Sequence, residues 1–335
     1  MARSSVIIPV RNDAERLTKL LASFEPRDWE QHEVLVVDDG STDDTVAAAA
    51  RFPARVVRLE RTVGPAAARN HGARVARWPI LVFVDSDVVL GPGALTRLIG
   101  WFDDSLASGV STIASATPEN PGFVARYCAV TDKHVCEHWD APAGGAAGDR
   151  CTWFSTRLGA IRADIFAEVG GFDARFERPS IEDAEFSVRL ARSHTLVLDR
   201  GVAHTHHWPA SPTVLLRRVF TNAKLLMREM RDDGEVGRDV MPVTERAGRV
   251  LGGLGVLLLP ATPLSAAAAI AAVGCLLASA WCHRALFGAY YRAGGLRFTL
   301  GCSVLHYLTT CAGLVGACVG AVTPVAKTKL GQGQA

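Results

Sequence analysis

The segment VFVDSDVVL places two aspartates, Asp85 and Asp87, at the end of an aliphatic run. Residues two apart on a β-strand point to the same face, so the two carboxylates would lie together. Such a pair forms a hard oxygen site that suits Mg²⁺ or Mn²⁺, and the ion can bridge to phosphate groups. A solvated turn would contain the same residues, so the motif alone leaves both interpretations open.

A second acidic pair, Asp38 and Asp39, closes the aliphatic run in HEVLVVDD. Adjacent carboxylates are unfavourable in a core because they repel each other and lose their hydration. The pair therefore either ends a strand in a solvated turn or faces a ligand that is rich in hydrogen-bond donors or cations.

Three further segments carry candidate functional side chains. Arg69 in GPAAARNHG is a cation for a diphosphate or an exposed helix arginine. Glu182 and Asp183 begin an amphipathic helix, where a carboxylate caps the helix or acts as a general base towards a hydroxyl. His204 and His206 alternate along HTHHW, so both could face one site as a metal ligand or a diphosphate contact. A polar strand end near lipid headgroups is the alternative for the histidines.

The segments that contain these residues alternate between the hydrophobic pattern of a strand and that of a helix. Short aliphatic runs predict strands, and capped segments with helical spacing predict helices between them. The predicted strands are 4–10, 32–39, 54–60 and 79–90, and the predicted helices are 12–24, 41–52 and 64–77. This order is typical of an α/β domain with a doubly wound, mostly parallel sheet, whose ligands bind beyond the carboxyl ends of the strands. Three strand ends would then meet at one edge, at residues 9–12, 38–40 and 85–87.

The pattern is looser after Gly91. Segments 103–123 and 139–153 are rich in Gly, Pro, Ala and Ser, and we expect them to be loops around a substrate region. Segments 163–176 and 180–194 have helical patterns, and 195–199 is a short strand.

Composition narrows the class of protein. The chain has 335 residues, and its formal net charge of +2 does not suggest nucleic acid as a partner. Its 8 cysteines form neither a zinc pattern nor a disulfide framework, so we expect buried free thiols. The apolar run near the N-terminus is too short for a signal-peptide core, and we expect the globular part to stay in the cytoplasm.

The C-terminal part is much more apolar than the rest. Residues 250–281 and 299–325 carry no charge, and both runs exceed the roughly 20 residues that span a bilayer. Pro260 and Pro263 interrupt the first run, which leaves three possibilities: a shorter span with an interfacial segment, one kinked helix, or a re-entrant hairpin. Arginines before the first run and lysines after the second favour about two spans with both flanks in the cytoplasm.

A basic amphipathic segment precedes these runs. Residues 211–231 mix aliphatic side chains with five Lys and Arg, which is typical of an interfacial helix or of a surface helix packed on its own domain. We therefore divide the chain into a globular domain at 1–210, a basic amphipathic helix and linker at 211–245, and a helical membrane region at 246–335.

The motifs, taken together, resemble a known family. In this order, VIIPVRN, VLVVDDGSTDDT, GPAAARNHG, VFVDSDVVL and GGFDARFERPSIEDAEFSVRL are similar to segments of the family 2 glycosyltransferases, which are inverting enzymes of the GT-A fold. The resemblance extends over residues 4–208. It implies a nucleotide-sugar donor, a Mn²⁺ or Mg²⁺ cofactor, and transfer by a single displacement.

The resemblance also assigns roles to individual residues. Asp87 matches the metal ligand, Asp85 a residue near both ribose and metal, and Asp183 the catalytic base of a Glu-Asp motif. His204 matches a histidine that completes the metal or diphosphate site in some members. The nucleotide-binding positions are Asp39, which accepts a hydrogen bond from the base, and the first-strand residues Pro9, Val10 and Arg11.

Some positions depart from the family pattern. Arg11 stands where an aromatic residue is common, and Thr62 and Val63 replace a segment that usually contains Asn. The segment 151–155 lacks the family's frequent acceptor signature, which leaves the acceptor undefined.

The leading hypothesis is a glycosyltransferase anchored in the cell membrane. It would transfer a sugar to a hydroxyl of a lipid-linked or cell-envelope glycan acceptor. A polyprenyl-phosphate sugar synthase is the close alternative, and a catalytically inactive membrane scaffold is a further one. A sugar nucleotidyltransferase would need a glycine-rich loop after the first strand, and PVRNDAERL has no glycine there.

Overall fold

The computed structural model describes residues 2–103, 107–138, 149–176, 178, 180–233 and 243–323. Within these residues an eight-stranded sheet has the order β3-β2-β1-β4-β8-β6-β9-β7, and β5 pairs with β10 in a two-stranded ribbon. The strands are β1 Ser4–Val10, β2 Glu33–Asp38, β3 Arg55–Arg58, β4 Ile80–Val84, β5 Val88–Leu90, β6 Gly109–Thr112, β7 Asp149–Cys151, β8 Leu158–Arg162, β9 Leu196–Asp199 and β10 His204–His206.

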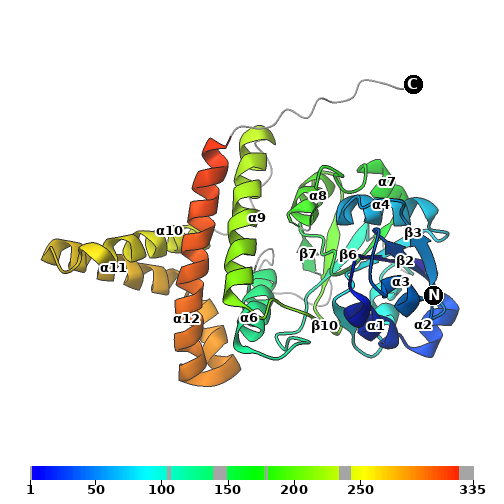
Figure 1. Ribbon diagram of the computed structural model, residues 1–335, viewed down its shortest axis with the longest axis horizontal. Helices are drawn as coiled ribbons and strands as arrows, with labels where there is room; N and C mark the ends of the chain where they lie inside the picture. The colour runs from blue at the N-terminus through cyan, green and yellow to red at the C-terminus, as the bar shows by residue number, and fades with distance from the viewer. Residues whose placement is uncertain are drawn as a thin grey trace.

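The helices cover both faces of the sheet and then form a separate C-terminal layer (Figure 1). They are α1 Ala14–Ala22, α2 Pro26–Gln31, α3 Thr45–Ala49, α4 Pro65–Val75, α5 Ala94–Gly100, α6 Phe123–His138, α7 Ala163–Glu168, α8 Glu182–Ala191, α9 Pro212–Asp233, α10 Val243–Leu258, α11 Ala266–Cys282 and α12 Arg284–Val322, with a 3₁₀ turn at Leu259–Ala261.

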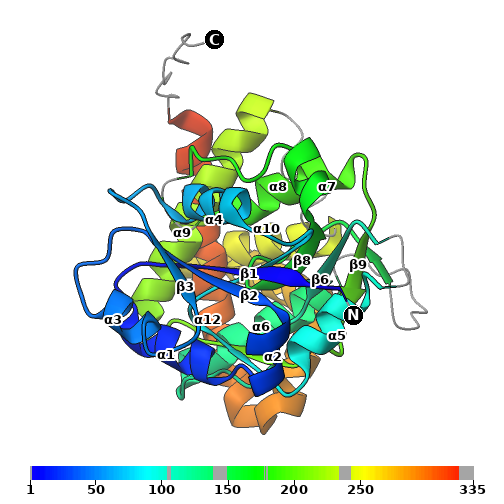
Figure 2. The same ribbon diagram turned by 90° about the vertical axis from the view of Figure 1, so that its right-hand side faces the viewer.

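Strand β1 shows why the sheet is buried on both sides. Val6 and Ile8 point into a core formed with α1 and α5, whereas Ile7 points into a second core with α4 and α8. Figure 2 shows α4, α7 and α8 on one face of the sheet and α1, α2, α3 and α5 on the other. Central parallel strands covered on both faces are continuous aliphatic runs, as in SSVIIPV.

The predicted α/β fold class is confirmed, with local differences. The run predicted as one strand at 79–90 is broken at the aspartates, because β4 ends at Val84 and β5 begins at Val88. The segment 103–123, expected to be a loop, contains the internal strand β6. Its buried hydroxyls are satisfied by the main chain, since Ser155 N donates to Ser111 Oγ at 3.0 Å and Thr112 Oγ1 donates to Leu158 O at 2.6 Å. Residues 139–148 of the second expected loop lie outside the described residues.

The C-terminal helices form two pairs. Helices α9 and α12 run side by side, and α10 and α11 form an antiparallel hairpin that projects away from the sheet (Figure 1). The first uncharged run is therefore two helices, divided at Pro260 and Pro263. By length and composition α12 can cross a membrane, although Gly294 and Gly295 kink it, and α11 is a shorter apolar helix. Residues 324–325 of the second run, and the lysines after it, lie outside the described residues.

Candidate active site

The two aspartates of VFVDSDVVL and a histidine from β10 meet at the edge of the sheet. The potential ligand atoms of Asp85, Asp87 and His206 all lie within 4.8 Å of one another. His206 Nε2 lies 3.2 Å from Asp87 Oδ1, and His206 Nδ1 is buried with no hydrogen-bond partner. Two carboxylates and an imidazole make a donor set that fits a divalent cation.

The predicted ligand His204 does not join this group, and His206 takes its place. The antiparallel register pairs His206 with Val88, next to Asp87, and pairs His204 with Leu90 further along β5. His204 is buried, its Nδ1 lies 3.3 Å from Val202 O, and burial lowers its pKa to about 4. Alternation along β10 puts His204 and His206 on the same face, but the register between β10 and β5 decides which of them reaches the carboxylates.

Charges around Asp87 keep it ionised. Burial raises the pKa of Asp87, but His206, Arg16 and Arg218 outweigh burial, so that the pKa lies below its ordinary value. Arg218 comes from α9, so a cation of the C-terminal layer acts on the cation site. Nothing in the motif VFVDSDVVL reveals this contribution, because Arg218 is distant in the sequence.

Arg69 is a buried bridge between two carboxylates. Its side chain is 4% exposed, and its guanidinium lies 2.5 Å from Asp85 Oδ1 and 3.1 Å from Glu182 Oε1. The sequence leaves two roles open for Arg69, a cation for a diphosphate and an exposed helix arginine. In the structure the side chain is buried, and both terminal nitrogens donate to protein carboxylates. Contact between Arg69 and a diphosphate stays a prediction. The bridge ties the start of α8, and thus Asp183, to the aspartate pair.

Asp183 lies in an environment that suits a general base. Burial raises its pKa to about 7, and the neighbouring Glu182 adds to the shift, while Arg157 and Arg69 oppose it. The amide of Ala184 donates to Asp183 Oδ1 at 2.9 Å. A base with a pKa near neutral pH is available in its deprotonated form and can still accept a proton effectively.

Arg157 lies outside every motif that the sequence indicates as functional. Its guanidinium donates to Asp132 Oδ2 at 2.7 Å and lies 5.4 Å from the ring centre of Trp208. Its carbonyl accepts a hydrogen bond from Asp85 N at 3.2 Å. Arg157 therefore connects the aspartate pair and Asp183 with α6, and no short motif marks this role.

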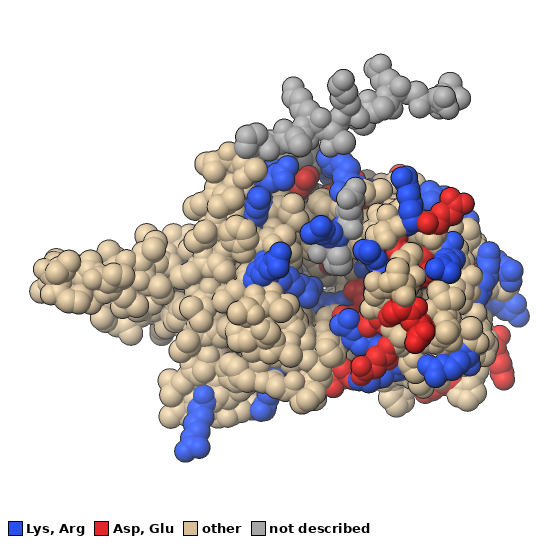
Figure 3. All heavy atoms as spheres, viewed as in Figure 1, with Lys and Arg blue, Asp and Glu red and all other residues tan. Residues whose placement is uncertain are grey.

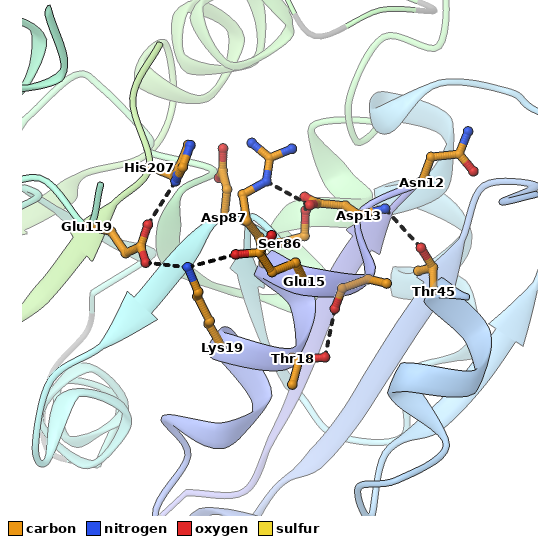
Figure 4. Close-up of polar contacts among 12 residues, drawn as sticks. Asn12, Asp13, Glu15, Thr18, Lys19, Thr45, Ser86, Asp87, Glu119 and His207 are labelled. Carbon is orange, nitrogen blue, oxygen red and sulfur yellow. Dashed lines mark hydrogen bonds and ion pairs between the residues drawn. The ribbon is translucent and has the colours of Figure 1, made fainter. Parts of the chain in front are cut away.

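A network of polar contacts fixes the loops beside Asp87 (Figure 4). Asp13 is the N-cap residue of α1 but makes no side-chain cap hydrogen bond, and its carboxylate accepts instead from Ser86 Oγ at 2.9 Å and Arg16 Nε at 2.7 Å. On the other side, Lys19 Nζ lies 3.0 Å from Glu119 Oε1, whose second oxygen lies 2.8 Å from His207 Nδ1. The segment between Asp85 and Asp87 is thus anchored to the first helix.

The acidic pair at the end of β2 organises the neighbouring loop. Asp39 Oδ1 accepts a hydrogen bond from Val63 N at 2.7 Å, and Asp39 Oδ2 accepts one from Gly64 N at 2.9 Å. Asp38 Oδ1 accepts from Ser41 N at 3.0 Å. Asp38 therefore holds a main-chain amide of the loop before α3, and Asp39 holds two amides directly before α4. Contact between Asp39 and a nucleotide base stays a prediction.

The predicted first-strand residues end β1 at the same edge. Pro9 and Val10 are buried in β1, where they pair with Val37 and Asp38, and Arg11 is exposed just beyond the strand. Their contact with a nucleotide also stays a prediction.

The fold and this site define the class of protein. A mostly parallel sheet carrying an Asp-x-Asp motif and a Glu-Asp motif at its strand ends is the GT-A arrangement. The family model described as Glycosyl transferase family 2 matches residues 5–132, so the N-terminal part of the chain is similar to this family.

Individual proteins are similar over parts of the chain. A pre-mycofactocin glycosyltransferase of Mycobacterium tuberculosis is 32% identical over 208 residues, which is 61% of this chain but only 42% of that protein's length. The succinoglycan biosynthesis protein ExoU of Rhizobium meliloti is 37% identical over 121 residues, 33% of this chain and 34% of ExoU. The chain therefore spans less than half the length of these relatives.

A solved structure supports the fold over nearly the whole chain. The mannosyltransferase PcManGT from Pyrobaculum calidifontis, in complex with GDP-Man and Mn²⁺, superposes with a TM-score of 0.55. The superposition covers 96% of this chain and 87% of PcManGT at 20% sequence identity.

Proposed function

We propose that the chain is an inverting glycosyltransferase that moves a sugar from a nucleoside diphosphate donor to a hydroxyl of an acceptor held at a membrane. The observation that carries this proposal is the linked pair of sites. Arg69 joins Asp85 of the cation site to Glu182, and the next residue is a carboxylate with a pKa of about 7. Donor activation and acceptor deprotonation would then occur in one rigid unit.

The residues for holding a cation are Asp85, Asp87 and His206. When bound there, a divalent ion would neutralise charge on the departing diphosphate. The chain's own contribution is to keep Asp87 ionised through Arg16, His206 and Arg218, and to fix Ser86 between the aspartates through Asp13.

Asp183 would take the proton from the acceptor hydroxyl as that oxygen attacks the anomeric carbon. The attack occurs on the face opposite the diphosphate, so one displacement inverts the configuration. Arg157 and Arg69 limit the rise in the pKa of Asp183, which keeps a useful fraction of the carboxylate deprotonated near neutral pH.

The C-terminal helices support an acceptor at a membrane. Helix α9 contacts the second core of the sheet through Leu225 and Leu226, and its Arg218 acts on Asp87. The cation site thus lies beside α9, and the apolar C-terminal helices lie on the opposite side of α9 (Figure 1). We infer that the catalytic domain lies in the cytoplasm and receives a lipid-linked or cell-envelope glycan acceptor.

A second candidate is a polyprenyl-phosphate sugar synthase. Arg218 favours it, because a cation directed from the apolar layer towards the cation site can also bind an acceptor phosphate. Such an acceptor is already anionic and needs no general base. The effect of removing the Asp183 carboxylate therefore separates the two candidates.

A screen for donor hydrolysis tests the proposal without a known acceptor. We expect the purified chain with Mn²⁺ to release nucleoside diphosphate from at least one member of a sugar-nucleotide panel, and Asp87→Ala to abolish the release. Asp164→Asn, an exposed aspartate on α7, is the matched control and should retain it. No release and no donor binding across the panel would favour an inactive scaffold.

A further inference from the structure

We propose that the chain is monotopic: the α10–α11 hairpin enters one leaflet and returns to the same side, and α12 lies along the membrane surface without crossing it. This inference rests on the membrane attachment proposed above. It differs from the sequence-based expectation of about two membrane spans, because no helix would cross the bilayer. The partner is a lipid bilayer, and the evidence is the distribution of charge, exposure and helix contacts.

The hairpin projects from the molecule, and it carries no Lys, Arg, Asp or Glu beyond the first turns of α10. The sequence has no Lys, Arg, Asp or Glu between Arg249 and Arg284, and Figure 3 shows the hairpin as an uncharged projection opposite the charged catalytic domain. Large side chains along it are exposed: Leu257 74%, Leu264 88%, Ile270 74% and Leu277 66%. An exposed apolar surface of this extent marks an interaction site, and its lack of polar groups fits lipid hydrocarbon.

The tip of the hairpin is suited to a medium without water. Thr262 N and Thr262 Oγ1 both donate to Leu259 O, at 3.2 and 2.8 Å, and Leu264 N donates to Ala261 O at 3.1 Å. Ser265 Oγ caps α11 by accepting from Ala268 N at 3.3 Å. Main-chain groups in a bilayer must be satisfied internally, and this turn satisfies several of its own.

The length of the hairpin fits insertion from one side. Helix α11 has 17 residues and is about 25 Å long, which is less than the roughly 30 Å hydrocarbon core. Both ends of the hairpin return to its base, where a Cβ on Gly248 would lie 2.5 Å from His283 Cε1. At this base Trp281 is 70% exposed, and the Arg284 guanidinium lies 4.8 Å from its ring centre. Trp and Arg together mark the headgroup level of a membrane.

Helix α12 presents one apolar face on the side of the hairpin. Its exposed large residues recur at intervals of four and seven, which places them on one face: Leu296, Leu300, Val304, Leu308, Val315 and Val322. The hairpin meets α12 through Tyr307, whose hydroxyl donates to Leu276 O at 3.3 Å, and through Leu314, beside Gly253. A flat membrane surface could therefore receive the hairpin and this face of α12 together.

Helix α9 prevents α12 from crossing the bilayer. A Cβ on Gly316 would lie 2.3 Å from Phe220 O, and one on Gly320 would lie 2.3 Å from Lys224 O, so the two helices are in close contact. Helix α9 carries five cations, Arg217, Arg218, Lys224, Arg228 and Arg231. A transmembrane α12 would draw this helix, and the catalytic domain attached to it, into hydrocarbon, where cations are strongly unfavourable.

Labelling of the α11–α12 junction tests the topology. Two spans would place Arg292 across the membrane from the catalytic domain, whereas a monotopic chain has both on one side. Arg292→Cys and Glu30→Cys, two exposed positions, would each be treated with a membrane-impermeant maleimide in sealed right-side-out and inverted vesicles. Peptide mass spectrometry separates each new cysteine from the native ones. We expect both sites to react in the same vesicle orientation; reaction in opposite orientations would overturn the proposal.

A matched pair of substitutions tests insertion of the hairpin. Leu257 and Val243 lie at opposite ends of α10 and are 74% and 72% exposed. We expect Leu257→Asp to weaken binding to vesicles of phosphatidylcholine and phosphatidylglycerol at least tenfold, and Val243→Asp to change it less than twofold. Equal effects, or no binding of the unaltered chain, would overturn the proposal. Neither assay needs sugar transfer, so topology and activity can fail separately.

Discussion

The strand-end edge of the sheet and the α10–α11 hairpin differ most in their content of charged residues. At the edge, Asp87 and Asp183 each lie near arginines from distant parts of the sequence, which oppose the effect of burial on their pKa values. The hairpin has no Lys, Arg, Asp or Glu between Arg249 and Arg284, and its helices approach closely through glycines such as Gly252 and Gly255. The first region is suited to binding polar ligands, and the second is suited to insertion into a lipid bilayer.

The largest expected effect concerns the base at the edge. Asp183→Asn keeps the size of the side chain but removes proton acceptance, and general-base catalysis contributes roughly 10²–10⁴-fold. We expect transfer to a hydroxyl acceptor to fall by about that factor while donor binding is retained, as measured by initial rates and calorimetry. Unchanged turnover would reject the role of Asp183 and favour a phosphate acceptor.

The next effect concerns the buried bridge that links the two sites. Arg69→Met leaves Asp85 and Glu182 without their common cation, and breaking a buried ion pair from one side costs about 3 kcal/mol or more. We expect a melting temperature lower by roughly 6–10 °C. Arg77→Met, which removes a 70% exposed arginine beside Glu33, is the control and should cost under about 1 kcal/mol. Similar shifts for both variants would show that the bridge is not structural.

The pH dependence of transfer gives a smaller, graded effect. The pKa of Asp183 is about 7, so the deprotonated base is depleted as pH falls below that value. We expect kcat/KM to decrease about tenfold per pH unit below about 6.5 and to level off above about 7.5. A profile that is flat between pH 5.5 and 8 would contradict a titrating base.

The smallest effect tests the packing of the apolar layer. Gly316→Ala would place a Cβ 2.3 Å from Phe220 O, whereas a Cβ at Gly274 on α11 meets nothing within 4 Å. We expect Gly316→Ala to lower stability by about 1–3 kcal/mol and Gly274→Ala to leave it unchanged or slightly higher. Melting temperatures in detergent would compare them, and equal values would argue against tight contact between α9 and α12.

The comparison also explains which features the sequence could predict. Aliphatic runs that end in aspartates predict strand ends, and parallel strands bring those ends to one edge, so Asp85 and Asp87 were recognisable in advance. The choice between His204 and His206 depends on their register with β5, which no local pattern records. The partners of Arg69 lie 16 and 113 residues away, and only the folded chain brings them together.

The apolar layer was predictable in composition but not in arrangement. Uncharged length alone favoured two spans, and Pro260 and Pro263 indicated that the first run is interrupted. The proposed orientation of α12 depends on its close contact with α9 at Gly316 and Gly320. Such a contact between helices depends on tertiary structure, so hydropathy could not distinguish a span from a helix lying on a surface.

Calorimetric titration of the chain with nucleoside diphosphates, with and without Mn²⁺, tests the cation site directly. We predict Mn²⁺-dependent binding of at least one nucleoside diphosphate. This binding should be lost in Asp87→Ala and in His206→Ala and retained in the control Asp164→Asn. Binding of equal strength without Mn²⁺, or undiminished binding by Asp87→Ala, would contradict the assignment of the cation site to this edge of the sheet.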